Sequence, residues 1–204
     1  MDWEELIPYI HPEDSRTITD AFLAEHSRAG VLPVPIESIV EFKLGINIVP
    51  IPGLQDRIGT VGFITSDLTE IDVDLDVAER HASRFRWTIA HEVGHILLHR
   101  PLYEAQAFAT PDEWKRWIGS IPDRLYRNLE IQANTMAAQI LMPLPALSRC
   151  FEEMIGKAAA HGVDWKTGPD TIYRQLARKF GVAPDSIKYA LRNEGIAEDP
   201  RNCE

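Results

Sequence analysis

The hydrophobic period of this chain changes at about residue 84, and the change indicates the fold class. Before it, segments 46–51, 59–65 and 69–77 have strand-like patterns, and the last of them alternates strictly between apolar and acidic residues. After it, apolar residues recur at helical spacing to the end of the chain. A small sheet followed by a helical body predicts an α+β fold. The predicted helices cover residues 15–29, 36–44, 84–100, 111–118, 123–142, 146–161, 170–180 and 184–193.

The last predicted strand has two contrasting faces. Its apolar face carries Ile71 and Val73. Its opposite face carries Asp72, Asp74 and Asp76. The acidic face could attract a basic substrate, or it could be a solvated face whose charges prevent edge-to-edge pairing of sheets. We favour the solvated face, because charged strand faces are common on protein surfaces.

The helix predicted over 84–100 contains the motif His91-Glu92-Val93-Gly94-His95. Residues four apart on a helix lie on one face, so His91 and His95 can bind one metal ion together. Imidazole nitrogens are common zinc ligands, and zinc acidifies water, for which Glu92 could act as general base. The alternative is a helix with two hydrogen-bonded histidines and a surface carboxylate.

A catalytic zinc ion needs a third protein ligand and one open position. Glu130 is a candidate, because it lies in a predicted helix where Ala133 and Ala137 would let a second helix approach closely. Asn134, one turn further on, could hydrogen-bond a ligand histidine and fix its tautomer. By spacing alone, Glu130 could equally be an exposed helix carboxylate.

Two other side chains could face this site. His99 lies one more turn along the motif helix, about 6 Å from His95 along the axis, so one ion cannot easily bind all three histidines. We expect it in the core or beside a ligand. Tyr126 lies four residues before Glu130 and could stabilise an oxyanion, but we favour a packing role.

Charge and cysteine content narrow the possible partners. Lys and Arg number 21 against 31 Asp and Glu, so the net charge of −10 makes the chain a poor general binder of nucleic acid. Cys150 and Cys203 are too few for a disulfide scaffold and fit a reducing compartment. No apolar run is long enough to span a membrane. We therefore expect a cytoplasmic protein with no membrane partner.

The C-terminal segment has the spacing of a helix-turn-helix, with Leu176, Gly181 and Ile187 at the packing and turn positions. Its second helix carries Lys188 and Arg192. One interpretation is DNA binding, and the other is a helical pair packed on the rest of the chain. We favour the packed pair because the chain is acidic overall.

Two stretches resemble the ImmA/IrrE family of metallopeptidases. The first is RFRWTIAHEVGHILLH over 84–99, and the second is EIQANTMAAQILMP over 130–143. The segments 33–36 and 44–46 are similar to the family's lead-in as well. The resemblance covers roughly residues 16–145.

The resemblance implies a zincin-like core, zinc-dependent proteolysis inside the cell, and His91, His95 and Glu130 as the zinc ligands. This sequence departs from the family pattern in two places. Trp87 stands where Phe is usual, and 34 residues separate His95 from Glu130. That long stretch contains two tryptophans, which suggests an extra helix over the cleft.

From these features we expect a metallopeptidase core over 1–145 and a helix-turn-helix-like helical segment over 146–204. The resemblance implies a specific protein substrate, such as a helix-turn-helix repressor cleaved in a stress or mobile-element response. The strand over 69–77 could bind the substrate backbone as an added strand. The alternative function is a non-catalytic regulator, or a toxin–antitoxin component, that binds a partner protein or DNA.

Overall fold

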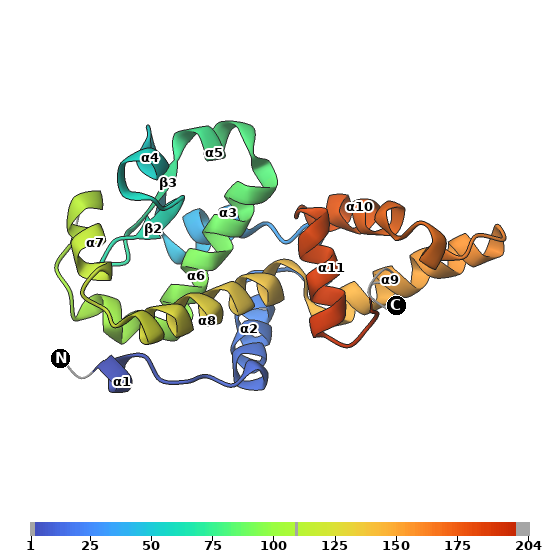
Figure 1. The fold of residues 1–204 in the computed structure, drawn as a ribbon, viewed down its shortest axis with the longest axis horizontal. Coiled ribbons are helices and arrows are strands. Elements are labelled where there is room, and N and C mark those ends of the chain that lie inside the picture. The colour runs from blue at the N-terminus through green and yellow to red at the C-terminus, as the bar shows by residue number, and fades with distance from the viewer. Residues whose placement is uncertain (1–2, 109, 199–204) are drawn as a thin grey trace.

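A computed structural model describes residues 3–108 and 110–198, and it confirms the α+β class (Figure 1). The sheet contains β1 (Asn47–Ile51), β2 (Gly62–Ile64) and β3 (Glu70–Asp74), in the order β1-β3-β2. The middle strand β3 runs parallel to β1 and antiparallel to β2. Both edges of β3 are therefore paired, so the prediction that this strand accepts a substrate strand is wrong.

Helices, joined by loops, make up most of the rest of the described chain (Figure 1). Two predicted helices, 111–118 and 184–193, are confirmed to the residue, and most others differ by a few residues at their ends. The helices are α1 (Trp3–Leu6), α2 (Pro12–His26), α3 (Ile36–Ile39) continuing into the π-helical turn Val40–Leu44, α4 (Leu54–Ile58), α5 (Leu75–Arg80), α6 (Ala82–Glu104), α7 (Pro111–Ile118), α8 (Asp123–Leu141), α9 (Leu144–Ala160), a 3₁₀ turn (Trp165–Thr167), α10 (Pro169–Phe180) and α11 (Pro184–Asn193).

The centre of the body is the packing of α6 against α8. Gly94 of α6 faces Ala133 of α8 so closely that a Cβ atom at position 94 would lie 2.9 Å from the Ala133 carbonyl oxygen. Ala133 and Ala137 are fully buried, as expected for small residues between two closely packed helices. This close contact brings the polar residues of the two helices within reach of one another.

The strand predicted over 69–77 ends earlier than expected. Asp74 terminates it by capping α5, because its carboxylate accepts hydrogen bonds from the backbone N–H groups of Asp76 at 3.0 Å and Val77 at 3.4 Å. The alternating pattern therefore continues past the point where the backbone becomes helical.

The prediction of a solvated acidic strand face is wrong for Asp72 and Asp74, which are buried. Asp76 is exposed as expected, but it lies in α5 rather than in the strand. The unpredicted helix α4 lies over this face, and its Gln55 N–H donates to Asp74 at 3.0 Å. Phe63, the register partner of Asp72, packs against Trp114 of α7 with ring centroids 5.3 Å apart. Burial raises the pKa of Asp72 to about 6, and the charge of Glu70 adds to this rise.

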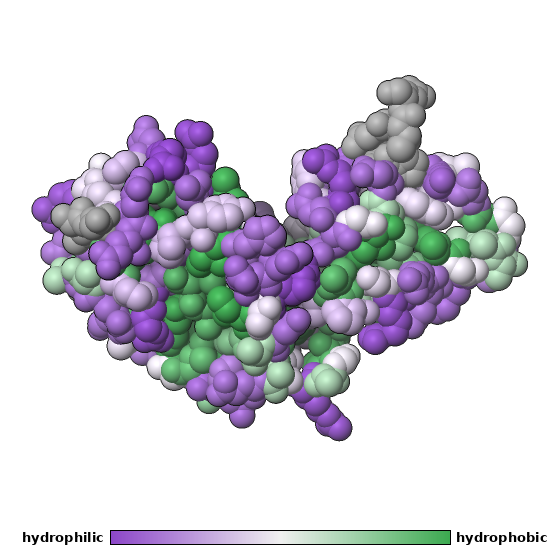
Figure 2. Space-filling model, turned by 90° about the horizontal axis from the view of Figure 1, so that it is seen from below, coloured by the Kyte–Doolittle hydropathy of each residue, from purple (hydrophilic) through white to green (hydrophobic). Residues whose placement is uncertain are grey.

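The C-terminal helices α9, α10 and α11 form the end of the molecule opposite α7 (Figure 1). In the view from below, a notch separates this end from the body that holds the sheet (Figure 2). Hydrogen bonds and ion pairs nevertheless join the two parts: Arg86 of α6 donates to the Gly181 carbonyl at 3.1 Å, and Arg16 of α2 pairs with Glu194. Gly181 makes the turn between α10 and α11 with φ of 68°.

Cys150 is a buried free thiol in α9, and Cys203 lies outside the described residues. Among the helices of the described chain, none combines the length and the apolar content needed to cross a membrane.

Candidate metal centre

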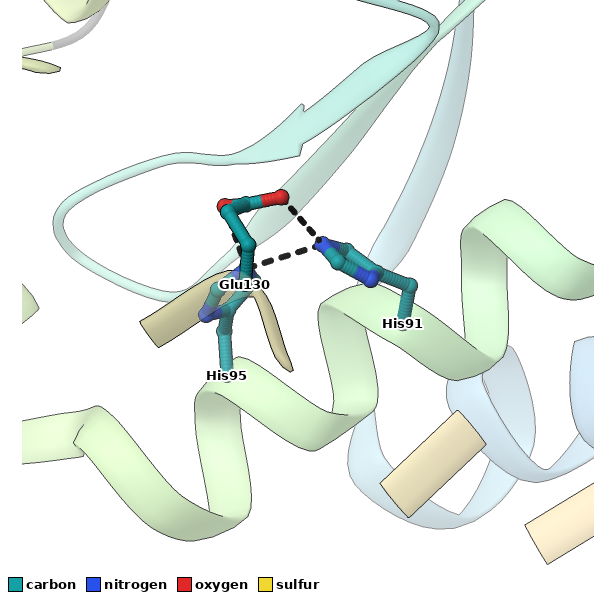
Figure 3. Close-up of side chains that lie close together, drawn as sticks. All are labelled: His91, His95 and Glu130. Atoms are coloured by element: carbon teal, nitrogen blue, oxygen red, sulfur yellow. Dashed lines mark hydrogen bonds and ion pairs between the residues drawn. The ribbon is translucent and has the colours of Figure 1, made fainter. Parts of the chain in front are cut away.

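Helices α6 and α8 bring His91, His95 and Glu130 together, as Figure 3 shows. The Nε2 atoms of the two histidines lie 3.0 Å apart. The Glu130 carboxylate oxygens lie 3.4 Å from His91 Nε2 and 3.6 Å from His95 Nε2. Three residues from two elements far apart in the sequence thus direct one ligand atom each to a common point.

The spacing of these atoms fits a tetrahedral zinc site. Ligand atoms about 2.0–2.2 Å from one zinc ion, at the tetrahedral angle, lie about 3.3–3.6 Å from one another. The two Nε2 atoms, 3.0 Å apart, and the distances of 3.4 Å from His91 to Oε2 and 3.6 Å from His95 to Oε1 are close to that range. With one atom taken from each residue, the three lie within 4.8 Å of one another. Two imidazoles and one carboxylate also form a donor set that zinc commonly takes in hydrolytic enzymes, with the fourth position open.

Glu92 lies beside these three residues with a different partner. Its Oε2 accepts a hydrogen bond from the backbone N–H of Ile64 in β2 at 3.0 Å, and the side chain is buried. Burial raises the pKa of Glu92, although the nearby histidines oppose this shift. A buried carboxyl with a raised pKa is suited to taking up and releasing a proton.

The three residues and Glu92 lie in a cleft with a volume of about 250 Å³. One wall comes from the segment before and at the start of β2, and another from α6, α7 and α8. The residues that line it are Gly59, Thr60, Val61, Gly62, Trp87, Thr88, His91, Glu92, His95, Tyr103, Trp114, Glu130 and Asn134. The long stretch between the motif and Glu130 does contribute Trp114 to the cleft, through α7.

Asn134 lies next to His91. Its Oδ1 is 3.3 Å from His91 Nδ1 and also accepts the indole N–H of Trp87 at 3.1 Å. Its Nδ2 donates to the Glu130 carbonyl at 2.9 Å. These contacts fix the amide orientation, so His91 donates from Nδ1 and turns Nε2 toward the common point.

The charged residues of the site affect one another. Burial lowers the pKa of His91, but the hydrogen bond and charge of Glu130 and the charge of Glu92 outweigh it, so the net pKa is raised. Burial raises the pKa of Glu130, but the neighbouring side chains of His91 and His95 outweigh it and leave the pKa well below its usual value. The carboxylate of Glu130 is therefore ionised and available to a cation.

His99 is fully buried behind His95 and outside the cleft lining. Its Nδ1 is 3.1 Å from His95 Nδ1, and its Nε2 is 2.8 Å from Gln132 Oε1. Burial lowers the pKa of His99 to about 3, so the ring is neutral. These contacts place His99 in the core against His95, and a core position is one of the two that the sequence predicted for it.

Tyr103 is a cleft residue that the sequence did not single out. The backbone of α6 leaves helical geometry at His99, two residues before Pro101. After this kink, the Tyr103 ring lies 5.6 Å from the His95 ring and lines the cleft. Pro101 was the sequence feature that could have predicted this kink. Tyr126, by contrast, packs against the core and does not line the cleft.

Comparisons with known proteins identify the family of this chain and a likeness in fold. Residues 77–192 match the model of the IrrE N-terminal-like domain, which is a peptidase family. A solved structure described as a Mycobacterium tuberculosis transcriptional regulator has a TM-score of 0.53 at 16% sequence identity. The match covers 94% of this chain and 52% of that one, so this chain spans about half the length of that protein. No curated protein matches the sequence.

Proposed function

Because this chain belongs to the family of the IrrE N-terminal-like domain, we propose that it is a zinc-dependent peptidase. In this proposal His91, His95 and Glu130 hold the ion, and Glu92 is the general base. The observation that supports it most strongly is the meeting of three ligand atoms within 4.8 Å of one another in a cleft, beside a buried carboxyl. A structural zinc site would normally be closed by a fourth protein ligand.

The chemistry follows from the roles that each side chain can take. A zinc ion held there would supply Lewis acidity to the scissile carbonyl and to water. Glu92 takes the proton of the attacking water and passes it to the leaving amine. Its hydrogen bond from Ile64 keeps the carboxylate turned into the cleft during both transfers.

Tyr103 is the group best placed to stabilise negative charge on the carbonyl oxygen. Burial raises the pKa of Tyr103 well above its usual value, so its hydroxyl keeps its proton and can donate a hydrogen bond. Its position in the cleft, against His95, supports this role.

We propose that the substrate backbone adds to the edge of β2 rather than to β3. β2 is an edge strand of the sheet, and Gly62 lines the cleft. A Cβ atom at position 62 would lie 2.6 Å from Thr88 Cγ2, so close packing requires glycine here. The backbone at this edge already makes local contacts, because the Gly62 carbonyl accepts a hydrogen bond from the Thr60 hydroxyl at 3.0 Å and the Ile64 N–H donates to Glu92. A substrate strand would therefore replace the contact with Thr60.

The proposed organisation is a zincin-like core over 1–145 and a helix-turn-helix-like segment over 146–204. The proposed substrate is a helix-turn-helix repressor whose cleavage starts a stress or mobile-element response. An enzyme with net charge −10 would attract a basic repressor. The likeness in fold to a protein described as a transcriptional regulator is compatible with a role in regulation.

A cleavage assay tests the proposal. The zinc-loaded protein is incubated with the repressor encoded beside it, and fragment masses are read. Glu92→Gln should keep the zinc and lower the cleavage rate by about 10²–10⁴-fold, whereas Glu79→Gln, at an exposed position of α5, should cleave normally. Full activity of Glu92→Gln would eliminate this mechanism.

A further inference from the structure

The buried side chains behind the cleft form a continuous chain of hydrogen bonds. We propose that His99 is a positioning residue that sets the tautomer of His95. The Pro8 carbonyl, in the N-terminal segment, determines which atom donates in each hydrogen bond of this series. This inference rests on the metal site proposed above. It concerns which nitrogen of His95 carries the proton in the metal-free protein.

The series of hydrogen bonds begins at Pro8, whose carbonyl oxygen can only accept a hydrogen bond. Gln132 Nε2 lies 2.9 Å from this oxygen and must be the donor. The amide of Gln132 is therefore fixed, with Oε1 turned toward His99 Nε2 at 2.8 Å. Because Oε1 is an acceptor, the His99 proton must be on Nε2.

The position of the His99 proton in turn determines the tautomer of His95, the proposed metal ligand. With its proton on Nε2, the neutral His99 ring presents the lone pair of Nδ1 to His95. The two Nδ1 atoms lie 3.1 Å apart, so His95 donates from Nδ1. Its Nε2 then carries a lone pair, and Nε2 is the atom that lies near His91 and Glu130. His95 is thus in the tautomer that a metal ion needs.

Because these side chains are buried, water cannot easily replace the hydrogen bonds between them. His99 is 0% exposed and Gln132 is 7% exposed, so water has little access to their polar atoms. If His99 lost its acceptor, the N–H of His95 would be buried without a partner or the ring would change tautomer. Either change would lower the affinity of the site for a metal ion bound by His95.

The N-terminal segment takes part in the site through this chain. Ile7 is buried and anchors the segment, and the next residue supplies the carbonyl that Gln132 needs. Figure 1 shows the segment, in blue, passing beneath α8 on its way to α2. A residue more than 80 positions before the motif thus helps to orient a metal ligand.

Two substitutions of His99 separate a positioning role from simple packing. His99→Asn can place an amide oxygen near the position of Nδ1 and keep the acceptor, whereas His99→Leu removes it. We expect zinc affinity, measured by competition with a chelator, to fall about 10–100-fold in His99→Leu and to stay within about threefold in His99→Asn. Equal affinities in the wild type and His99→Leu would overturn the proposal.

A spectroscopic measurement on the metal-free protein gives a second readout. In ¹⁵N NMR, recorded at a pH where the His95 ring is neutral, His95 of the wild type should carry its proton on Nδ1, and Gln132→Leu, which leaves His99 in place, should lose this preference. A His95 proton on Nε2 in the wild type would contradict the inference, even if zinc binds. If the wild type binds no zinc at all, the proposed function fails, while the tautomer still decides this inference.

Discussion

The carboxylate of Glu92 accepts a hydrogen bond from the backbone N–H of Ile64, 3.0 Å away on the neighbouring sheet. This contact connects the motif helix to the strand that borders the cleft. The proposed general base and the proposed substrate-binding edge are therefore held in one fixed relation. Catalysis benefits from such preorganisation, because reacting groups need not search for their geometry.

Removing the third ligand should weaken metal binding more than it affects folding. Glu130 is partly exposed in α8, and its replacement by Ala suits a helix. We expect Glu130→Ala to lose zinc affinity by more than about 100-fold. Elemental analysis after dialysis, with thermal unfolding as the folding control, measures this. Wild-type zinc content in the variant would assign the third ligand to another residue.

Tyr103→Phe should affect turnover rather than binding. If the hydroxyl stabilises charge that develops only in the transition state, kcat should fall about 10²–10³-fold with little change in KM. Tyr189→Phe is the matched control, because Tyr189 is exposed on α11. Steady-state kinetics on the cleaved substrate compares them, and an equal kcat in both variants would remove Tyr103 from the mechanism.

Gly94→Ala should destabilise the protein through packing alone. A Cβ atom there would lie 2.9 Å from the Ala133 carbonyl and 3.1 Å from Met136 Cβ, so α6 and α8 must move apart. Overpacking of this kind costs about 1–3 kcal/mol. Chemical denaturation of the metal-free protein measures the loss. Gly156→Ala in α9, where no atom lies within 4 Å of the added Cβ, should show no such loss.

Asp72 should make the metal-free protein less stable as the pH rises through mild acidity. Its folded pKa of about 6 lies above the usual 3.8, so between these values the unfolded chain releases the proton first. The stabilising contribution of Asp72 alone is therefore full below pH 3.8 and is lost as the pH approaches 6. The loss is about 2 kcal/mol after allowance for solvent screening.

Asp72→Asn should abolish that loss and raise the stability at neutral pH. Asp56→Asn, at an exposed position of α4, is the control and should leave the pH profile unchanged. Urea unfolding at several pH values between 4 and 7 compares the three proteins. Because Glu130 has a lowered pKa and acts in the opposite direction, the test is the difference in stability between the wild type and Asp72→Asn. A difference that stays constant over this range would contradict a cost of burying Asp72.

The sequence predicts the helical body better than the sheet. The helix at 111–118 was recognisable because Thr110 and Glu113 form a capping box and Pro111 starts it. The strand at 69–77 was mistaken because Asp74 serves both as a strand residue and as a helix cap. Local alternation cannot reveal that a short helix from another part of the chain covers the acidic face.

Local sequence pattern likewise predicts some residues of the site and not others. His91, His95 and Glu92, the two proposed ligands and the proposed base, lie within about one helical turn, so periodicity alone places them together. Glu130 comes from another helix, and its position depends on the close packing at Gly94. Tyr103 and the chain from Pro8 to His95 depend on a kink and on tertiary contacts, which no local pattern encodes.

A crystal structure of the zinc-loaded protein, with anomalous data at the zinc edge, tests the central claim most directly. The account predicts one peak about 2.0–2.2 Å from His91 Nε2, His95 Nε2 and a Glu130 oxygen, with no fourth protein ligand. Histidines turned away from the peak, or a fourth side chain bound to the ion, would contradict it.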